Sequence, residues 1–284
     1  MKTWSETLEP TDFTATYKVS RMLYEERSSH QHVMLFENAI MGRVLVLDGI
    51  VQTTEKDEFI YHEMIVHVPV LAHGAARRVL IIGGGDGGAL EELFKHQSIE
   101  HATLVDIDHK VIELSQRFLG TICGQAFADP RLDLVIADGR KFVSETEAHY
   151  DIVIVDSPDP IGPGAALFTT DFYRDCRRCL TPGGVLVTQN GVPFTQSEEL
   201  RDSMTALKSI FADARCYLTN VPSYIGGTLA LGWATDDDKL WQTPVEDLQD
   251  RFEHSAIATR YYTPALQSAS FALPGFITEL IVSC

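Results

Sequence analysis

The chain has 284 residues, of which 45% are hydrophobic and 22% are charged. This length and composition indicate a globular protein, with one large domain or a large and a small one, whose core needs no disulfide or metal ion for stability. The formal net charge of −17 disfavours binding to DNA or RNA, but an acidic solvated surface explains most of it equally well, so charge alone identifies no ligand.

The five cysteines are odd in number and irregularly spaced. Cys176 and Cys179 form a CxxC pair without a second pair, so we expect no zinc site and no other metal. Free thiols are typical of a reducing compartment. No apolar run approaches membrane-spanning length, and the first residues lack an apolar signal region. A cytoplasmic protein that binds no membrane is expected.

The first fifty-odd residues predict antiparallel β structure. Residues 33–36 and 44–47 are short apolar runs with a turn between them. Asp48 and Gly49 supply a hairpin signal before residues 50–54. We therefore expect a small N-terminal β-hairpin domain over residues 1–54 and a second domain over residues 55–284.

The pattern changes to an alternation of helices and strands after residue 54. Residues 57–73 are rich in helix formers and predict a helix. This alternation predicts an α/β domain in which helices cover both faces of a Rossmann-like parallel sheet, with ligands at the carboxyl ends of the strands. Strands are predicted over residues 79–82, 102–106, 132–136, 151–155 and 184–188, and helices from about residue 88 and over 110–118 and 198–211.

A glycine-rich turn separates the first of these strands from its helix. Residues 83–88 read GGGDGG and fit the pattern GxGxxG, and Asp106 ends the next strand. A carboxylate at that position can accept hydrogen bonds from both ribose hydroxyls. A tight turn with an ordinary strand-end acid is the alternative. The joint occurrence of turn, helix and acid favours a nucleoside site.

Asp86 lies inside this turn, where a dinucleotide would place its phosphates. A carboxylate there repels phosphate and favours a cationic nucleoside, such as the sulfonium adenosylmethionine or its decarboxylated form. Because Asp86 can pair with an amine but penalises a nearby carboxylate, we expect the decarboxylated form. Asp138 and Gly139 follow another strand, where an adenine amino group can be recognised.

Two carboxylates follow the fourth predicted strand. Asp156 and Asp159 lie in the sequence DSPDPIGPG, a proline-stiffened loop. Aspartate and proline also favour ordinary turns. Beside a nucleoside site, however, two acids can hold a diamine by charge-assisted hydrogen bonds, and the loop can close over bound substrate.

These residues resemble the spermidine synthases, or polyamine aminopropyltransferases, over nearly the whole chain. The resemblance is carried by the glycine turn and by residues 42–49 (GRVLVLDG), 51–64 (VQTTEKDEFIYHEM), 156–163 (DSPDPIGP) and 187–191 (VTQNG). It implies a methyltransferase-type Rossmann-like domain after a small antiparallel β domain. It also implies transfer of the aminopropyl group of decarboxylated adenosylmethionine to putrescine, which yields spermidine and methylthioadenosine.

The resemblance also implies site residues and an assembly. Asp156 would be the catalytic proton acceptor, assisted by Tyr61, in a homodimer or homotetramer. The implied nucleoside contacts are Gln31, Gln52, Gly83, Gly85, Asp106, Asp138, Gly139 and Pro163, with Asp86 on the aminopropyl amine. The implied diamine contacts are Tyr61, His62, Asp86, Asp156, Asp159, Gln189 and Tyr224.

The chain departs from the family pattern at three positions, and other functions stay open. Asp106 stands where Glu is common, Pro158 where a small hydroxyl residue is usual, and Glu91 where Arg is common. The alternatives are an N-methyltransferase acting on a small amine, a non-catalytic polyamine-binding protein and, more distantly, a nicotinamide dehydrogenase. The length of the acceptor is also open, because cadaverine, agmatine or a triamine would suit the same charges.

Overall fold

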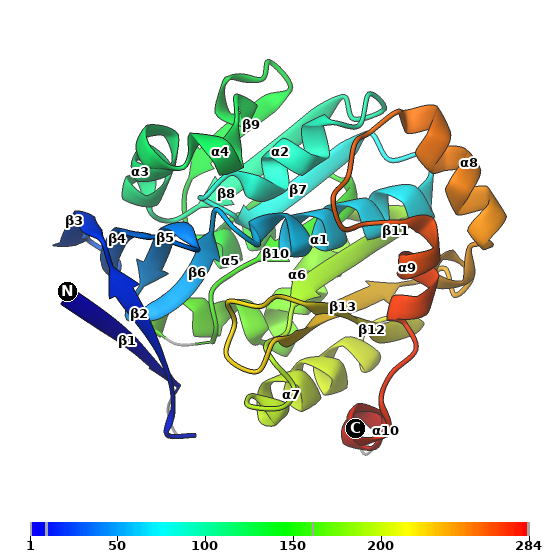
Figure 1. Ribbon diagram of the computed structural model, residues 1–284. Coiled ribbons are helices and arrows are strands. Elements are labelled where there is room, and N and C mark those ends of the chain that lie inside the picture. Colours follow the sequence, from blue (N-terminus) through cyan, green and yellow to red (C-terminus); the bar gives the residue numbers. More distant parts are fainter. Residues whose placement is uncertain (1, 9–10, 161, 283–284) are drawn as a thin grey trace.

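The computed structural model describes residues 2–8, 11–160 and 162–282, except for the side chains of Gly162 and Pro163. Two small antiparallel sheets at the N-terminal end lie beside a large central sheet that has helices on both faces (Figure 1). The predicted α/β class is confirmed. Among the described cysteines, Cys123, Cys176, Cys179 and Cys216 are free and buried, and Cys284 lies outside the described residues.

The N-terminal strands form a hairpin and a four-stranded antiparallel meander, as the turn signals predict. The predicted boundary after residue 54 falls between the last of these strands and the first helix. The division into domains at this point stays a prediction. The strands are β1 (Lys2–Leu8), β2 (Phe13–Val19), β3 (Arg21–Arg27), β4 (His32–Asn38), β5 (Gly42–Leu47) and β6 (Ile50–Thr54).

The central sheet has the strand order β12-β13-β11-β10-β7-β8-β9. Strands β11, β10, β7, β8 and β9 are parallel, whereas β13 runs antiparallel to both β11 and β12. The predicted parallel sheet is therefore extended at one edge by antiparallel strands, which the sequence reasoning did not predict. The strands are β7 (Arg78–Gly83), β8 (His101–Asp106), β9 (Leu132–Ile136), β10 (Tyr150–Asp156), β11 (Leu180–Gln189), β12 (Asp213–Asn220) and β13 (Thr228–Thr235).

Alternate residues of the central strands enter two separate cores, one on each face of the sheet. In β7, Val79 and Ile81 pack with α1 (Glu58–His73), whereas Leu80 and Ile82 pack on the opposite face. The first face also carries α2 (Gly88–Phe94), α8 (Val245–Ser255) and α9 (Pro264–Ser270), and the second carries α5 (Gly139–Glu145), α6 (Thr170–Arg178), α7 (Ser197–Lys208) and α10 (Gly275–Val282).

The helix α3 (His109–Phe118) joins the N-terminal meander to the central sheet. Its Val111 and Leu114 share a buried cluster with Val33, Leu35 and Leu45 of the meander. This contact fixes the meander over one end of the sheet. The remaining short helices are α4 (Gly120–Cys123) and the 3₁₀ turns Ala126–Ala128, Gly162–Phe168 and Leu240–Gln242.

Two element boundaries differ from the predictions by three residues or more. β11 begins at Leu180 rather than residue 184, because Leu180 pairs with Tyr150 and the strand resumes its pairing at Val185 after a bulge. Residues 181–184 form this bulge. The helix predicted to reach residue 211 ends at Lys208, although Phe211 is still buried in the same core.

No single helix among the described residues is long and apolar enough to span a membrane. The bent pair α9 and α10 would reach that length and composition only if both helices were counted together.

The strand order places the functional loops next to one another. β7 lies between β10 and β8, so the chain order reverses at β7 and opens a crevice at the carboxyl ends. The register pairs Gly83 with Asp156, and the Gly84 N–H donates to the Asp156 carbonyl oxygen at 2.9 Å. Asp106 ends the neighbouring strand β8. The glycine turn and both predicted acids thus meet at one edge.

Candidate active site

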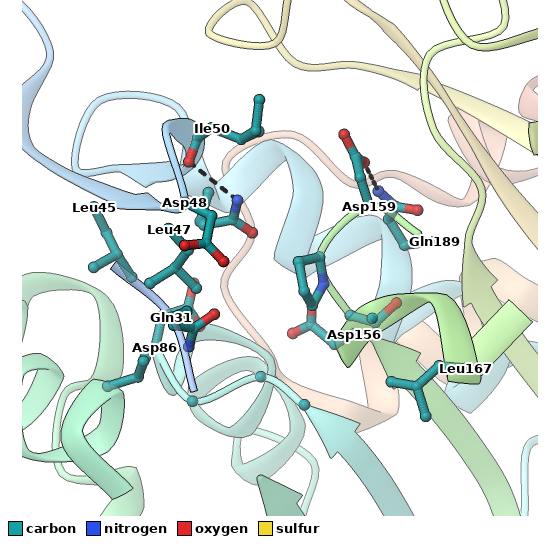
Figure 2. Close-up of a pocket in the computed structure, with 18 of the residues that line it drawn as sticks. Gln31, Leu45, Leu47, Asp48, Ile50, Asp86, Asp156, Asp159, Leu167 and Gln189 are labelled. Carbon is teal, nitrogen blue, oxygen red and sulfur yellow. Dashed lines mark hydrogen bonds between the residues drawn. The ribbon is translucent and has the colours of Figure 1, made fainter. Parts of the chain in front are cut away.

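A cavity of about 400 Å³ occupies this crevice, with the N-terminal meander along one side (Figure 2). All but two of the predicted site residues line it. The lining residues among the predicted set are Gln31, Gln52, Tyr61, Gly83, Gly85, Asp86, Asp106, Asp138, Gly139, Asp156, Asp159, Gln189 and Tyr224. Of the other two, His62 does not line the cavity, and the side chain of Pro163 lies outside the described part of the structure.

The glycine turn brings the backbone closer to the acids than any side chain would permit. Gly83 has a positive φ of 81°, and a Cβ added there would lie 2.1 Å from the Asp156 carbonyl oxygen. A Cβ added at Gly85 would lie 2.6 Å from an Asp106 carboxylate oxygen. Gly83 is therefore required by conformation and by close approach, and Gly85 by close approach alone.

Asp106 lies partly buried at the predicted nucleoside end of the cavity. Its Oδ1 accepts a hydrogen bond from the Asp108 N–H at 2.7 Å. Burial raises the pKa of Asp106 to about 6. Asp108 in turn accepts hydrogen bonds from Ser28 Oγ at 2.6 Å and Gln31 Nε2 at 3.0 Å, which anchors the predicted contact Gln31 beside Asp106. The shorter acid in place of the common Glu still reaches the cavity.

A second polar corner of the nucleoside end is formed by Asp138, which caps helix α5. Its Oδ1 accepts from the Arg140 N–H at 2.8 Å and the Lys141 N–H at 3.3 Å. A Cβ added at Gly139 would lie 2.4 Å from Ile82. The cavity here is also lined by the apolar residues Ile82, Val105, Ile107 and Leu167, so it combines an apolar wall with a carboxylate edge, as a purine ring requires.

Asp86 presents an ionised carboxylate inside the turn. Its Oδ1 accepts from the Gly88 N–H at 3.0 Å, and its Oδ2 lies 3.4 Å from His62 Nε2. Burial alone would raise the pKa of Asp86, but the His62 charge and these hydrogen bonds outweigh it and lower the pKa. A buried anion at this point fits a cationic ligand.

His62 does not line the cavity, although the resemblance places it in the diamine channel. It is 1% exposed, and its ring packs so closely on Gly88 that a Cβ there would meet the ring at 2.2 Å. Its Nδ1 lies 2.8 Å from Glu58 Oε2. His62 Nε2 lies 3.4 Å from Asp86 Oδ2, and its contact with a diamine stays a prediction.

Asp156 and Tyr61 form a hydrogen-bonded pair at the centre of the cavity. The Tyr61 hydroxyl donates to Asp156 Oδ1 at 2.7 Å, whereas Asp156 Oδ2 is buried without a hydrogen-bond partner. Burial, and then the Asp86 charge, raise the pKa of Asp156 to about 6. Burial and the Asp156 charge also hold the pKa of Tyr61 well above 10, so the phenol stays protonated and acts as a donor. The free oxygen of Asp156 can accept a proton from a ligand.

The far end of the cavity is built around Asp159. Gln189 Nε2 donates to one of its oxygens at 3.0 Å (Figure 2), and Gln196 Nε2 donates to the other at 2.8 Å. Burial raises the pKa of Asp159. Tyr224 completes this end, because its hydroxyl donates to the Gln52 carbonyl oxygen at 2.8 Å and its ring lies 6.3 Å from that of Tyr61.

Two lining residues of this end, Glu6 and Gln196, were missed by sequence reasoning. Glu6 is on β1, and its Oε1 accepts from the Val51 N–H at 3.0 Å while its Oε2 has no partner. Burial raises the pKa of Glu6 to about 7. The residues around Glu6 form no pattern that predicts a buried or functional side chain. Gln196 lies just before the predicted helix over residues 198–211, and this position could have drawn attention to it.

The geometry also brings His62, Asp86 and Asp156 together, with one polar atom of each within 4.8 Å of the others. Such a group can bind a metal ion only if the imidazole offers a lone pair. Both nitrogens of His62 face carboxylates, and the pKa of the ring is raised well above 6.5 despite its burial. A doubly paired imidazolium has no lone pair, so the arrangement fits an ion-pair network.

Thermal stability should fall as pH rises from about 6.5 to about 9. Glu6 has a pKa of about 7, and Glu199 on α7, raised by burial and the Asp159 charge, has one of about 8. Both folded-state pKa values lie above the pKa of Glu in the unfolded chain. The stability that the two protonated side chains contribute is therefore lost as pH rises through their folded-state pKa values. Burial lowers the pKa values of His67 and His96 to about 3, so both rings are neutral in the folded protein. They make stability rise with pH, but only below the unfolded pKa of about 6.5, which is outside this range.

Differential scanning calorimetry of the wild type and of a double variant carrying Glu6→Gln and Glu199→Gln checks this. The double variant should show a shallower dependence of the melting temperature on pH. A wild-type melting temperature that rises across this range would contradict the assignment of these two acids.

The chain is similar to proteins of one known family. Residues 58–243 match the family described as "Spermine/spermidine synthase domain", and residues 3–55 match the "Spermidine synthase tetramerisation domain". The chain is 52% identical over 281 residues to polyamine aminopropyltransferase 1 of Pseudomonas aeruginosa, which covers 99% of this chain and 98% of that protein. It is 51% identical over 268 residues to the polyamine aminopropyltransferase of Ruegeria sp., with 94% of each chain covered.

Two solved structures share the fold over the whole chain. One is a spermidine synthase in complex with the transition state analogue AdoDATO, with a TM-score of 0.94, 35% identity, and coverage of 100% of this chain and 96% of that one. The other is the spermidine synthase from Thermotoga maritima, with a TM-score of 0.93, 34% identity, and coverage of 100% and 95%.

Proposed function

This chain belongs to the spermine/spermidine synthase family and is a polyamine aminopropyltransferase, and we propose that it transfers the aminopropyl group of decarboxylated adenosylmethionine to putrescine, giving spermidine and methylthioadenosine. The nucleoside would lie between Asp106 and Asp138, its aminopropyl amine beside Asp86, and the diamine between Asp156 and Asp159. The analogue complex of the related structure supports an adenosyl ligand in this fold.

One observation carries the proposal, namely the position of the Tyr61–Asp156 pair between two further carboxylates. Asp86 lies on the glycine-turn side of Asp156 and Asp159 on the other side, next to Gln189 (Figure 2). Three carboxylates along one cavity match a donor ammonium, a reacting amine and a distal ammonium. An N-methyltransferase would need a place for the carboxylate of adenosylmethionine, which Asp86 opposes.

The reaction is a displacement at carbon, in which a C–N bond to the acceptor forms as the C–S bond of the sulfonium breaks. The electron pair leaves with sulfur, which departs as a neutral thioether. The nucleophile is the difficulty, since an alkylamine has a pKa of about 10.4 and freeing its lone pair near pH 7 costs about 5 kcal/mol. In-line placement of the two reactants would supply much of the acceleration.

Asp156 would receive the proton that the amine loses. Its Oδ2 has no partner, and Tyr61 fixes the other oxygen by donating to it. A carboxylate with a pKa near 6 is a weak base toward an alkylammonium, so the acceptor would attack as the neutral amine. Asp156 would then hold, and share the proton of, the secondary ammonium that C–N bond formation produces. Tyr61 would orient Asp156 and remain protonated throughout.

The test is an acceptor panel with decarboxylated adenosylmethionine, in which methylthioadenosine is measured. We expect the highest kcat/KM with putrescine and lower values with cadaverine, agmatine and spermidine. Methyl transfer from adenosylmethionine would favour the N-methyltransferase, and binding of polyamines without formation of methylthioadenosine would favour a non-catalytic binding protein.

Asp159→Asn should raise the KM for putrescine by roughly tenfold to a hundredfold while kcat at saturation falls much less, because a charge-assisted contact to the distal ammonium is lost. Initial rates with putrescine and with butylamine decide this. Butylamine has no second ammonium, so its kcat/KM should hardly change. An equal loss with both acceptors would show that Asp159 does not bind the distal amine.

Assembly through the N-terminal segment also belongs to this proposal. Residues 3–55 match a tetramerisation domain, and this segment carries the exposed apolar side chains of Phe13 (55% exposed) and Ile40 (74%). These observations support a homodimer or homotetramer in which the N-terminal strands lie in the contact.

A further inference from the structure

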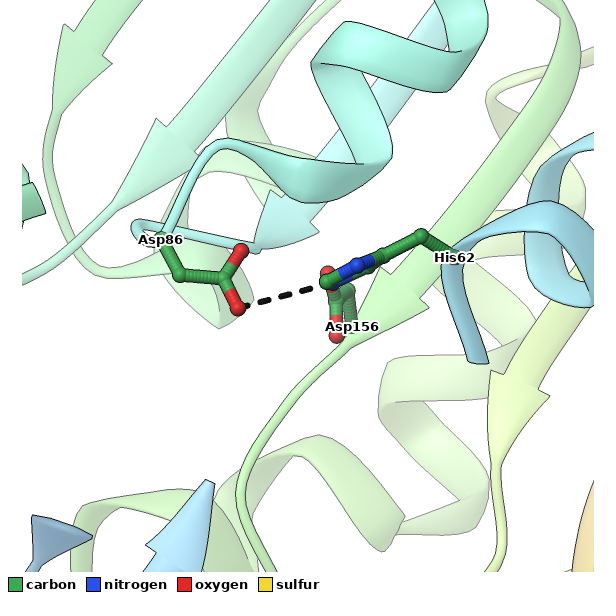
Figure 3. Close-up of side chains that lie close together, drawn as sticks. All are labelled: His62, Asp86 and Asp156. Carbon is green, nitrogen blue, oxygen red and sulfur yellow. Dashed lines mark ion pairs between the residues drawn. The ribbon is translucent and has the colours of Figure 1, made fainter. Parts of the chain in front are cut away.

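A line of three ionisable side chains runs from helix α1 to Asp86 of the glycine turn, which lines the cavity. Glu58 Oε2 lies 2.8 Å from His62 Nδ1, and His62 Nε2 lies 3.4 Å from Asp86 Oδ2. Figure 3 shows the second of these ion pairs, with Asp156 beside the ring. The side chains of Glu58, His62 and Asp86 are only 11%, 2% and 13% exposed, so water screens this line weakly.

Four ionisable side chains lie against the ring of His62. Glu58 and Tyr61 come from α1, Asp86 from the glycine turn and Asp156 from the end of β10. None of them is a cation. Burial alone would lower the pKa of His62, but Asp86 and Glu58 reverse this effect and raise it well above 6.5.

We propose that Glu58 and His62 act as positioning residues that hold the Asp86 carboxylate in place for the donor's aminopropyl ammonium. This rests on the proposed function. Neither Glu58 nor His62 lines the cavity, so both act through Asp86. His62 fixes one Asp86 oxygen, and the Gly88 N–H fixes the other. Two carboxylates and one imidazolium leave a net charge of −1, which matches one ammonium.

The same imidazolium affects the reacting amine. Its charge opposes the effect of Asp86 on Asp156 and lowers the pKa of that acid. A fixed cation near the acceptor nitrogen also disfavours protonation of that nitrogen. The carboxylates stabilise the protonated form of the acceptor amine and so make its deprotonation harder. The positive charge of His62 offsets part of this effect.

The proposal predicts different effects on two ligands of the same nucleoside site. In Glu58→Gln, the affinity for decarboxylated adenosylmethionine should fall by roughly tenfold, because a charge-assisted network that orients Asp86 is weakened. The affinity for methylthioadenosine, which lacks the aminopropyl amine, should stay within about twofold of the wild type. Isothermal titration calorimetry of the folded variant measures both.

A matched control exists elsewhere in the chain. Glu92 is also a buried Glu beside a histidine, with Oε2 lying 3.0 Å from His67 Nε2 and 2.7 Å from Lys95 Nζ, and it does not line the cavity. Glu92→Gln should leave the affinities for both ligands unchanged. If Glu58→Gln weakened both ligands equally, or neither, the positioning role would be wrong.

The protonation of His62 has a readout that needs no substrate. Nitrogen-15 NMR of labelled histidines should show one imidazolium that persists well above pH 6.5 and is missing in His62→Asn. In Glu58→Gln this signal should titrate at lower pH. A neutral His62 ring in the wild type at pH 7 would overturn the proposal, whereas lack of methylthioadenosine formation by the wild type would instead overturn the proposed function.

Discussion

Asp156→Asn should lower kcat by about 10²- to 10⁴-fold, with a far smaller change in donor affinity, because a proton acceptor is removed while the shape of the site is kept. Asn retains an oxygen that can accept the Tyr61 hydrogen bond of 2.7 Å. It supplies no group that takes up the proton of the acceptor nitrogen. Single-turnover rates, together with calorimetric titration of the donor, separate the two effects.

The pH profile gives this prediction a second readout. Because the pKa of Asp156 is raised to about 6, wild-type activity should decline as pH falls through that value and the carboxylate protonates. On the alkaline side, activity should rise as the acceptor amine loses its proton. The decline near pH 6 should be absent in Asp156→Asn. Equal losses of turnover and donor binding would make Asp156 a binding residue, and a flat wild-type profile from neutral to alkaline pH would mean that chemistry is not rate-limiting.

Asp86→Asn should abolish most of the preference for the decarboxylated donor. With decarboxylated adenosylmethionine, kcat/KM should fall by roughly a hundredfold, because a buried carboxylate no longer pairs with the donor ammonium. With adenosylmethionine the loss should be much smaller, because the repulsion of its carboxylate disappears at the same time. The ratio of kcat/KM for the two donors, measured in wild type and variant, gives the result.

Asp129→Asn is a suitable control for that substitution. Asp129 forms an ion pair with Arg131 at 2.8 Å and does not line the cavity. Its replacement should leave the donor ratio unchanged. If the wild type used adenosylmethionine as well as the decarboxylated donor, the role of Asp86 in donor choice would be wrong.

The sequence supports prediction of those features that depend on local pattern. The alternation around residues 79–82, the glycine turn and Asp106 each have a spacing with a physical cause, and the structure places them together. The position of Asp156 beside Gly83 could also be anticipated in outline, because parallel strands bring their carboxyl ends to one edge.

The features that escaped prediction depend on contacts between distant segments. Glu6 meets Val51 across 45 positions, and nothing in its neighbours marks it as buried. His62 and Tyr61 are adjacent on one helix, yet only Tyr61 lines the cavity, because the ring of His62 turns onto Gly88. The rotation of a helix about its axis depends on packing, and a single sequence does not reveal it.

The strand β1 carries Glu6 to the cavity, within the segment that matches a tetramerisation domain. Under the proposed function and assembly, subunit contact and acceptor binding would draw on the same few dozen residues. A substitution in this hairpin would then be exposed to selection for both properties at once. An exchange of the hairpin between relatives would be expected to change assembly together with acceptor binding, so both would have to be measured.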